Sequence, residues 1–218
     1  MELIGQTRES LAAYTCAQVA NLVPDGRRGD ALLPVVTRHI DEALARTGRC
    51  IDAVRMWRPG QFNYLHSSQY CQYLYYLANT IWRNERNGEA CTKLFLLNKA
   101  LNAIDLFYEI EMPEVFFIGH SVGIVLAKAT YGNYLVLYQN STVGKNHGVA
   151  PVIGEGVVMY PNTAIIGRSH VRDNSVVAQG VSVLNRETPG NCLVYAGQAG
   201  DLVCKPASER AAEEYFRV

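Results

Sequence analysis

The chain has 218 residues, 49% of them apolar, and its 20 basic and 20 acidic side chains give a formal net charge of zero. This length allows one large domain or two small ones with a substantial hydrophobic core. The balanced charge excludes the basic surface typical of nucleic-acid-binding proteins and the polybasic segment of a membrane anchor. The N-terminal residues lack a secretory-signal pattern and no apolar run is long enough to span a membrane, so we expect a cytoplasmic protein.

Residues 1–105 carry three apolar stripes at helical spacing, which predicts an α-helical domain. Gly48 is the expected C-cap of the first predicted helix, and Ser67 or Ser68 is the expected N-cap of the second. The tyrosines of the second helix favour core or subunit interface over a ligand platform, because an aromatic stripe at helical spacing usually packs inside. The stripes are Leu33, Val36, Ile40 and Leu44; Tyr70, Leu74, Leu77 and Ile81; and Leu94, Leu97, Leu101 and Ile104.

The stretch from Ile153 to Val183 repeats every six residues. Such a hexad is typical of a parallel β-helix, in which each short strand contributes one large side chain to a narrow core and three hexads complete one coil. Ordinary alternating strands are the alternative, but polar residues such as Asn162 and Arg168 interrupt the alternation. The large positions are Ile153, Met159, Ile165, Val171, Val177 and Val183, and the small positions four residues later are Val157, Thr163, Ser169, Ser175 and Val181.

A looser hexad extends this pattern back to Leu106. Its positions are Leu106, Met112, Ile118, Ile124, Thr130, Val136 and Thr142. Eleven residues, not twelve, separate Thr142 from Ile153, so we expect the polar segment 144–148 to form a loop that protrudes from the coil. The predicted organisation is α+β: an α-helical domain at 1–105, a β-helix at 106–208 and a tail at 209–218, with a short helix over 209–217.

The six cysteines are scattered, and no two have the close spacing of a metal or redox motif. We therefore expect free thiols in the core and no metal site. A β-helix has no pocket of its own, so a small-molecule site is expected in the groove between neighbouring β-helices, which implies an oligomer. Histidine is the side chain best suited to accept a proton near neutral pH. Of the five, His120 is flanked by glycines and His147 lies in the predicted loop, which makes these two the candidates.

Residues 118–126, Ile-Gly-His-Ser-Val-Gly-Ile-Val-Leu, resemble the histidine-containing coil of serine acetyltransferases, hexapeptide-repeat enzymes that make O-acetylserine from acetyl-CoA. Residues 139–144, 151–167 and 196–200 continue the similarity. The resemblance implies a left-handed coil, a trimer or dimer of trimers, and acetyl-CoA in the groove as cosubstrate. It also implies that His120 is the general base, oriented by an acid fifteen residues earlier, which is Asp105, with Glu109 and Glu111 as rivals.

The same resemblance predicts which residues contact acetyl-CoA. The regular coils present evenly stacked backbone amides to a pantetheine arm, and a lysine in the last turn is expected near the phosphates. The expected contacts are Asn162, Thr163, Ala178, Gly180, Gly197 and Lys205.

Two departures from the family concern the acceptor. The family has Asp immediately before the histidine, where this chain has Gly119, and the family's Arg-His pair before a proline is replaced by Val149 and Ala150. His147 substitutes for the second histidine, and no arginine stands nearby, so a carboxylate would lack a partner. We therefore expect the acceptor to be a hydroxyl or an amine of another small molecule, with a sugar of surface-polysaccharide biosynthesis as the first choice. Serine O-acetylation and an inactive scaffold that binds a partner enzyme are the alternatives.

Overall fold

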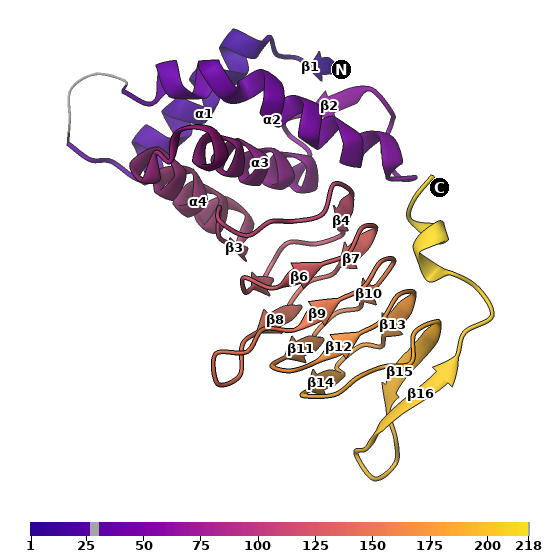
Figure 1. Ribbon diagram of the computed structural model, residues 1–218. Coiled ribbons are helices and arrows are strands. Elements are labelled where there is room, and N and C mark those ends of the chain that lie inside the picture. The colour runs from indigo at the N-terminus through magenta and orange to yellow at the C-terminus, as the bar shows by residue number, and fades with distance from the viewer. Residues whose placement is uncertain (27–30, 218) are drawn as a thin grey trace.

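The computed structural model describes residues 1–26 and 31–217. Four helices at the N-terminus stack on one end of a parallel β-solenoid of short strands (Figure 1). This architecture confirms the fold predicted from the sequence. The helices are α1 (Arg8–Leu22), α2 (Leu33–Ala53), α3 (Ser67–Glu85) and α4 (Gly88–Asn102). The helical part also contains a short parallel pair of strands, β1 (Glu2–Ile4) and β2 (Gln61–Asn63).

Both predicted helix caps are wrong. Helix α2 continues past Gly48 to Ala53, because Cys50 and Ile51 beyond the glycine are fully buried and extend the apolar stripe. Helix α3 begins at Ser67, but His66 occupies the N-cap position without a side-chain cap. The hydroxyl of Ser68 instead donates to the backbone oxygen of Gly119 in the solenoid, at 3.4 Å.

The tyrosines of α3 pack inside the protein, as predicted. Tyr73, Tyr75 and Tyr76 are almost completely buried. The hydroxyl of Tyr75 donates to the backbone oxygen of Ile110 at 2.6 Å and accepts from the N–H of Met112 at 3.1 Å. Helix α3 therefore holds the segment that enters the solenoid.

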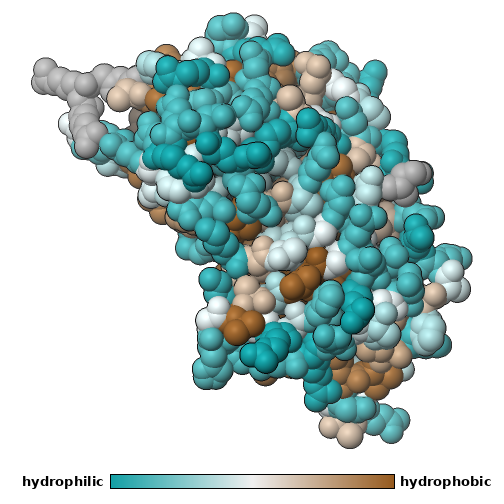
Figure 2. Space-filling model, viewed as in Figure 1, coloured by the Kyte–Doolittle hydropathy of each residue, from teal (hydrophilic) through white to brown (hydrophobic). Residues whose placement is uncertain are grey.

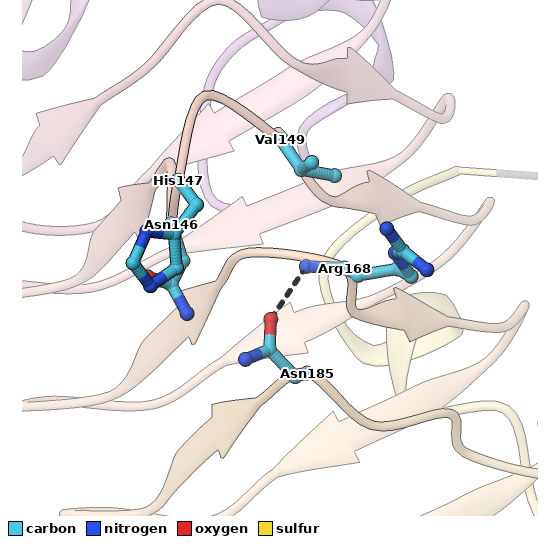
Figure 3. Close-up of a pocket in the computed structure, with 5 residues that line it drawn as sticks. All are labelled: Asn146, His147, Val149, Arg168 and Asn185. Atoms are coloured by element: carbon cyan, nitrogen blue, oxygen red, sulfur yellow. Dashed lines mark hydrogen bonds between the residues drawn. The ribbon is translucent and has the colours of Figure 1, made fainter.

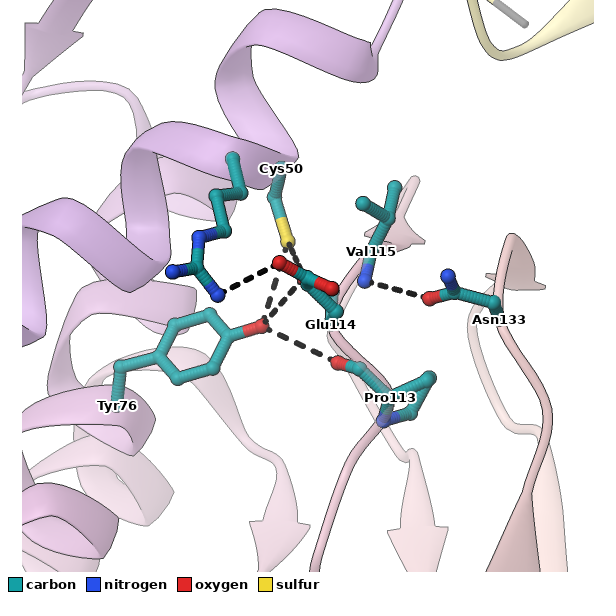
Figure 4. A network of polar contacts seen from close by, with 7 residues as sticks. Cys50, Tyr76, Pro113, Glu114, Val115 and Asn133 are labelled. Atoms are coloured by element: carbon teal, nitrogen blue, oxygen red, sulfur yellow. Dashed lines mark hydrogen bonds and ion pairs between the residues drawn. The ribbon is translucent and has the colours of Figure 1, made fainter.

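A second set of polar contacts joins the helices to the first coil (Figure 4). The hydroxyl of Tyr76 lies 3.3 Å from the backbone oxygen of Glu114, to which the thiol of Cys50 also donates. One residue further on, the N–H of Val115 donates to Asn133 Oδ1 of the next coil at 2.8 Å. Because these hydrogen bonds lie where the helices meet the solenoid, they fix the first coil relative to α2 and α3.

The solenoid has three sheets, and the chain visits them in turn. The six-stranded sheet contains β4 (Phe116–Ile118), β7 (Leu135–Leu137), β10 (Val158–Met159), β13 (Ser175–Val177), β15 (Cys192–Ala196) and β16 (Leu202–Pro206). The five-stranded sheet contains β3 (Asp105–Leu106), β5 (Val125–Leu126), β8 (Thr142–Gly144), β11 (Ala164–Ile166) and β14 (Ser182–Leu184). The three-stranded sheet contains β6 (Thr130–Tyr131), β9 (Val152–Ile153) and β12 (His170–Val171). All pairs are parallel except β15 with β16, which form an antiparallel hairpin at the far end.

The strict hexad from Ile153 to Val183 is confirmed, since all six large positions are buried in the narrow core. The looser hexad is wrong at Thr130, Val136 and Thr142, which point away from the solenoid core. The next residues, Tyr131, Leu137 and Val143, fill the core instead. The frame shifts because the coil corners in this part have unequal lengths.

After β16 the chain turns back along the outer face of the six-stranded sheet and ends beside α2 (Figure 1). The helix predicted over 209–217 is only a short 3-10 helix, η1 (Ala211–Glu214). No disulfide joins any of the six cysteines, and five of them are buried, as predicted; Cys204 is only partly buried. Burial raises the pKa of the Cys50 thiol to about 11. Within the described residues, no helix has both the length and the apolar character to cross a membrane.

Candidate active site

His120 lies in an enlarged corner of the solenoid. Ile118 is aligned with Leu137 in the six-stranded sheet, and Leu126 with Val143 in the five-stranded sheet. Eight positions separate Ile118 from Leu126, whereas six separate Leu137 from Val143, so the corner that carries His120 has two extra residues. The extra length displaces the side chain from the regular coil, and His120 is exposed.

Tyr138 and Ser68 lie against this corner. The ring of Tyr138, one coil further on, lies with its centroid 6.3 Å from that of His120. A Cβ at position 119 would lie only 2.7 Å from Tyr138 Cε1, so the tyrosine ring occupies the space that a side chain at Gly119 would need. The Ser68 hydroxyl contacts the same backbone from the side of α3. The acid that the family carries before its histidine therefore has no room here.

His147 lies in a second enlarged corner. Ten positions separate Val143 from Ile153, against six between Ile165 and Val171 in the next coil, so the predicted loop has four extra residues. His147 adopts a positive φ of 48°, which turns the loop tightly. The loop and the coil beyond it line a pocket of about 310 Å³ formed by Asn146, His147, Val149, Arg168 and Asn185 (Figure 3).

Arg168 corrects the expectation that no arginine stands near His147. It lies one coil beyond the loop and 21 positions further along the sequence, where its N–H donates to Asn185 Oδ1 at 2.8 Å. Its guanidinium extends on the side of the pocket away from the His147 ring (Figure 3). Among the described residues, no carboxylate is paired with it, so the guanidinium can bind an anion.

His120 and His147 do not meet within one chain. His120 precedes β5, and His147 follows β8, which pairs with β5 in the five-stranded sheet. The two histidines therefore lie at opposite ends of the strands of that sheet, at two different corners of the solenoid.

Of the acids proposed as partners of His120, Asp105 lies nearer to its corner. Asp105 is aligned with Val125, and its N–H donates to the backbone oxygen of Ile124 at 2.8 Å. Its carboxylate, however, pairs with Lys99 at 2.6 Å. Glu109 pairs with Lys128, and exposed Glu111 acts electrostatically on Arg46 of the helical domain. None of these acids forms a hydrogen bond with His120.

Three of the residues expected to contact acetyl-CoA follow His120 along one edge of the solenoid. Asn162, Ala178 and Gly180 occupy the equivalent corners of later coils, and no atom lies within 4 Å of a Cβ built on Gly180. The side chain of Thr163 points into the core, where its hydroxyl contacts that of Ser141, so only its backbone faces a ligand. Gly197 lies in the turn between β15 and β16, and exposed Lys205 lies on β16. These assignments stay predictions.

Four N-terminal helices followed by a parallel β-solenoid are also the fold of solved serine acetyltransferases, which this chain resembles in structure. The solved serine acetyltransferase of Brucella abortus matches 94% of this chain and 86% of its own, with a TM-score of 0.70 and 17% identity. The soybean enzyme complexed with serine matches 91% of this chain and 85% of its own, with a TM-score of 0.65 and 19% identity.

Sequence comparison gives a partial match. A Schizosaccharomyces pombe protein named "Putative serine acetyltransferase" is 26% identical over 136 residues, or 59% of this chain. This chain spans about half of that relative's length, 49%. No family model matches the chain.

Proposed function

We propose that this protein is an acetyl-CoA-dependent O-acetyltransferase and that His120 is its general base. In the proposed reaction, His120 takes the proton of an acceptor hydroxyl as the oxygen attacks the thioester carbonyl of acetyl-CoA. The C–S bond breaks, CoA leaves as a thiolate that receives the proton from the His120 imidazolium, and the acceptor becomes an acetyl ester. The acyl group moves directly, without an acyl-enzyme.

The enlarged His120 corner is the observation that carries this proposal. It places a proton acceptor outside the regular coil, at the start of an edge formed by corners at Asn140, Asn162 and Gly180. The open space around Gly180 fits an extended pantetheine arm lying along this edge. Backbone amides at successive corners would bind its polar groups, and Lys205 would bind a phosphate.

Serine is the first candidate acceptor. The relatives are serine acetyltransferases, and one is solved in complex with serine. The sequence offered no partner for the carboxylate of serine. Arg168 supplies one, because its guanidinium lies next to the His147 loop and pairs with no carboxylate of the residues that the structure describes.

A sugar hydroxyl is the second candidate. Gly119 has no carboxylate to hold the amine of serine, and the ring of Tyr138 fills that space. An aromatic ring beside the base favours an uncharged acceptor with an apolar face.

A neighbouring copy of the chain completes the proposed site. His120 and His147 lie at opposite ends of the strands in the five-stranded sheet. If both histidines act on one acceptor, the loop that carries His147 must come to His120 from a second solenoid. The solenoid exposes apolar side chains that suit such a contact, including Val125, Val152 and Leu184. Figure 2 shows separate hydrophobic patches on the lower, solenoid part of the molecule. A trimer or a dimer of trimers would pair each His120 with a neighbour's loop.

The test measures release of free CoA from acetyl-CoA with serine and, separately, with a panel of nucleotide sugars. Turnover with serine supports the first candidate, and turnover with a sugar alone supports the second. Hydroxyl-free analogues of each acceptor serve as controls. If no acceptor gives turnover and the protein binds no CoA, the inactive scaffold becomes the better interpretation.

A further inference from the structure

The segment after β16 covers one face of the solenoid. Val136 and Val158 are outward-facing residues of the six-stranded sheet, yet both are completely buried. The covering residues Ala212, Tyr215 and Phe216 are also buried. We call residues 211–217 the C-terminal strap.

The strap is fastened to the end of α2. The N–H of Arg55 donates to the backbone oxygen of Tyr215, and the N–H of Arg217 donates to that of Ala53, both at 2.7 Å. The guanidinium of Arg217 donates to four backbone oxygens, those of Asp52, Val54, Arg55 and Trp57, at 2.6–2.9 Å. A cation at the C-terminal end of a helix also interacts favourably with the helix dipole. The strap is therefore held in one position by several charge-assisted bonds.

This position brings Tyr215 against the coil next to His120. The rings of Tyr138 and Tyr160 stack with centroids 5.7 Å apart, and the ring of Tyr215 meets Tyr138 edge-on at 6.2 Å. The hydroxyl of Tyr215 lies 3.4 Å from the hydroxyls of both other tyrosines. These distances are long for hydrogen bonds, so the contact depends mainly on ring packing. Burial raises the pKa of Tyr215 well above its ordinary value, and its hydroxyl stays protonated.

Tyr138 links this cluster to the candidate base. On one side its ring meets Tyr215, and on the other it lies over Gly119 and beside His120. The ring of Tyr138 lies against Gly119, and the hydroxyl of Ser68 donates to its backbone oxygen from the side of α3, so these two groups limit where the His120 corner can move.

We infer that Tyr215 is a positioning residue: by packing against Tyr138, the strap fixes the orientation of the His120 ring. This inference rests on the proposed function for its catalytic consequence. The structural coupling of Tyr215 to His120 can be measured without any acetyl transfer.

The experiment records the imidazole Cε1–H signals of the full-length protein by NMR, without substrates, and assigns His120 with His120→Asn. Tyr215→Ala removes the supporting ring, and Tyr215→Phe keeps it. Phe216→Leu is the matched control, because Phe216 belongs to the strap but packs on Tyr134, with centroids 5.4 Å apart. The expected result is a shifted or broadened His120 signal in Tyr215→Ala only.

Kinetics of the same variants give the second measurement. Displacing a base by about 1 Å costs up to roughly 10²-fold, so we expect Tyr215→Ala to lower kcat about 10-fold or more with little change in KM for acetyl-CoA. Tyr215→Phe should restore most of kcat. Tyr215 also packs on Phe117, three residues before His120, with ring centroids 6.0 Å apart. In a Tyr138→Ala background, Tyr215→Ala should therefore cause a smaller further loss than it causes alone, because the part of the effect that passes through Tyr138 is already gone.

An unchanged His120 signal in folded Tyr215→Ala would overturn the inference. So would equal losses of activity in Tyr215→Ala and Phe216→Leu, because those losses would indicate a general role of the strap in stability. If the wild-type protein transfers no acetyl group, the proposed function fails, and the NMR comparison alone decides whether Tyr215 positions His120.

Discussion

The ring of Tyr138 occupies the space next to Gly119 that an aspartate would need at that position. A Cβ on residue 119 would approach Tyr138 Cε1 to 2.7 Å, closer than real Cβ contacts. The glycine before the histidine and the tyrosine one coil later are therefore mutually dependent. This dependence distinguishes the His120 corner from the family pattern.

Gly119→Asp should consequently destabilise the protein unless Tyr138 is also changed. Forcing a side chain into filled space costs about 1–3 kcal/mol. Gly119→Asp/Tyr138→Ala should recover part of this loss, whereas Tyr138→Ala alone should destabilise. Denaturant unfolding of the four proteins measures the coupling, and strict additivity would show that the two positions are independent.

The His120 variants test the chemistry. His120→Asn keeps a polar side chain but has no nitrogen that can take the proton, so turnover should fall roughly 10²- to 10⁴-fold while CoA affinity and unfolding stay unchanged. Steady-state kinetics and CoA binding check this. His120 is exposed, so the substitution removes little packing.

His147→Ala is the comparison for that experiment. A loop residue that holds the acceptor should raise KM for the acceptor more than it lowers kcat. If His147→Ala abolishes turnover and His120→Ala leaves turnover nearly unchanged, the roles assigned to the two histidines are reversed.

The core of the solenoid could be predicted because each strand repeats the same local chemistry. Ile165, Val171 and Val177 are evenly spaced and all buried, as the six-residue period indicates. The period also located the loop at His147. The period could not reveal the two extra residues at the His120 corner. The next corner, from Leu126 to Tyr131, is one residue shorter than six, so the six-residue spacing is nearly restored after it. Only the alignment of the strands shows that one corner is longer and the next is shorter.

The parts of the site that the sequence did not predict are contacts between segments far apart in the chain. After His147 the chain completes the loop and one full coil, and it then reaches the equivalent corner of the next coil, where Arg168 lies beside His147. The coil period could have suggested this neighbour. Tyr215 has no such signal, since the strap lies outside the repeat and is placed by Arg217 and the end of α2.

Tyr75→Phe should destabilise the junction between the two parts of the chain. The hydroxyl of Tyr75 satisfies the buried backbone oxygen of Ile110 and N–H of Met112. Tyr75→Phe removes this partner of the Met112 N–H and leaves the oxygen of Ile110 with a long contact from Asn79 Nδ2 at 3.5 Å. Losing the partner of a buried polar group costs about 1–3 kcal/mol, measurable by denaturant unfolding. Tyr14→Phe is the control, because its half-buried hydroxyl accepts from the side chain of Gln18, and its loss should cost less than about 0.5 kcal/mol. Equal effects of the two variants would contradict this role.

Gly180→Asn tests the proposed acetyl-CoA edge without disturbing the coil. Gly180 has a φ of 75°, and the equivalent corners carry Asn140 and Asn162 with φ of 58° and 61°. Asparagine is the non-glycine side chain that best tolerates this left-handed conformation, so the variant should fold normally.

The added side chain at position 180 would stand in open space on the edge assigned to pantetheine. We expect KM for acetyl-CoA to rise several-fold while KM for the acceptor changes little. Gly148→Asn is the matched control, because Gly148 also has a positive φ, 78°, and open space around it, but lies in the His147 loop. It should affect the acceptor instead. An unchanged KM for acetyl-CoA in folded Gly180→Asn would remove Gly180 from the binding edge and move the predicted path of the pantetheine arm to another face.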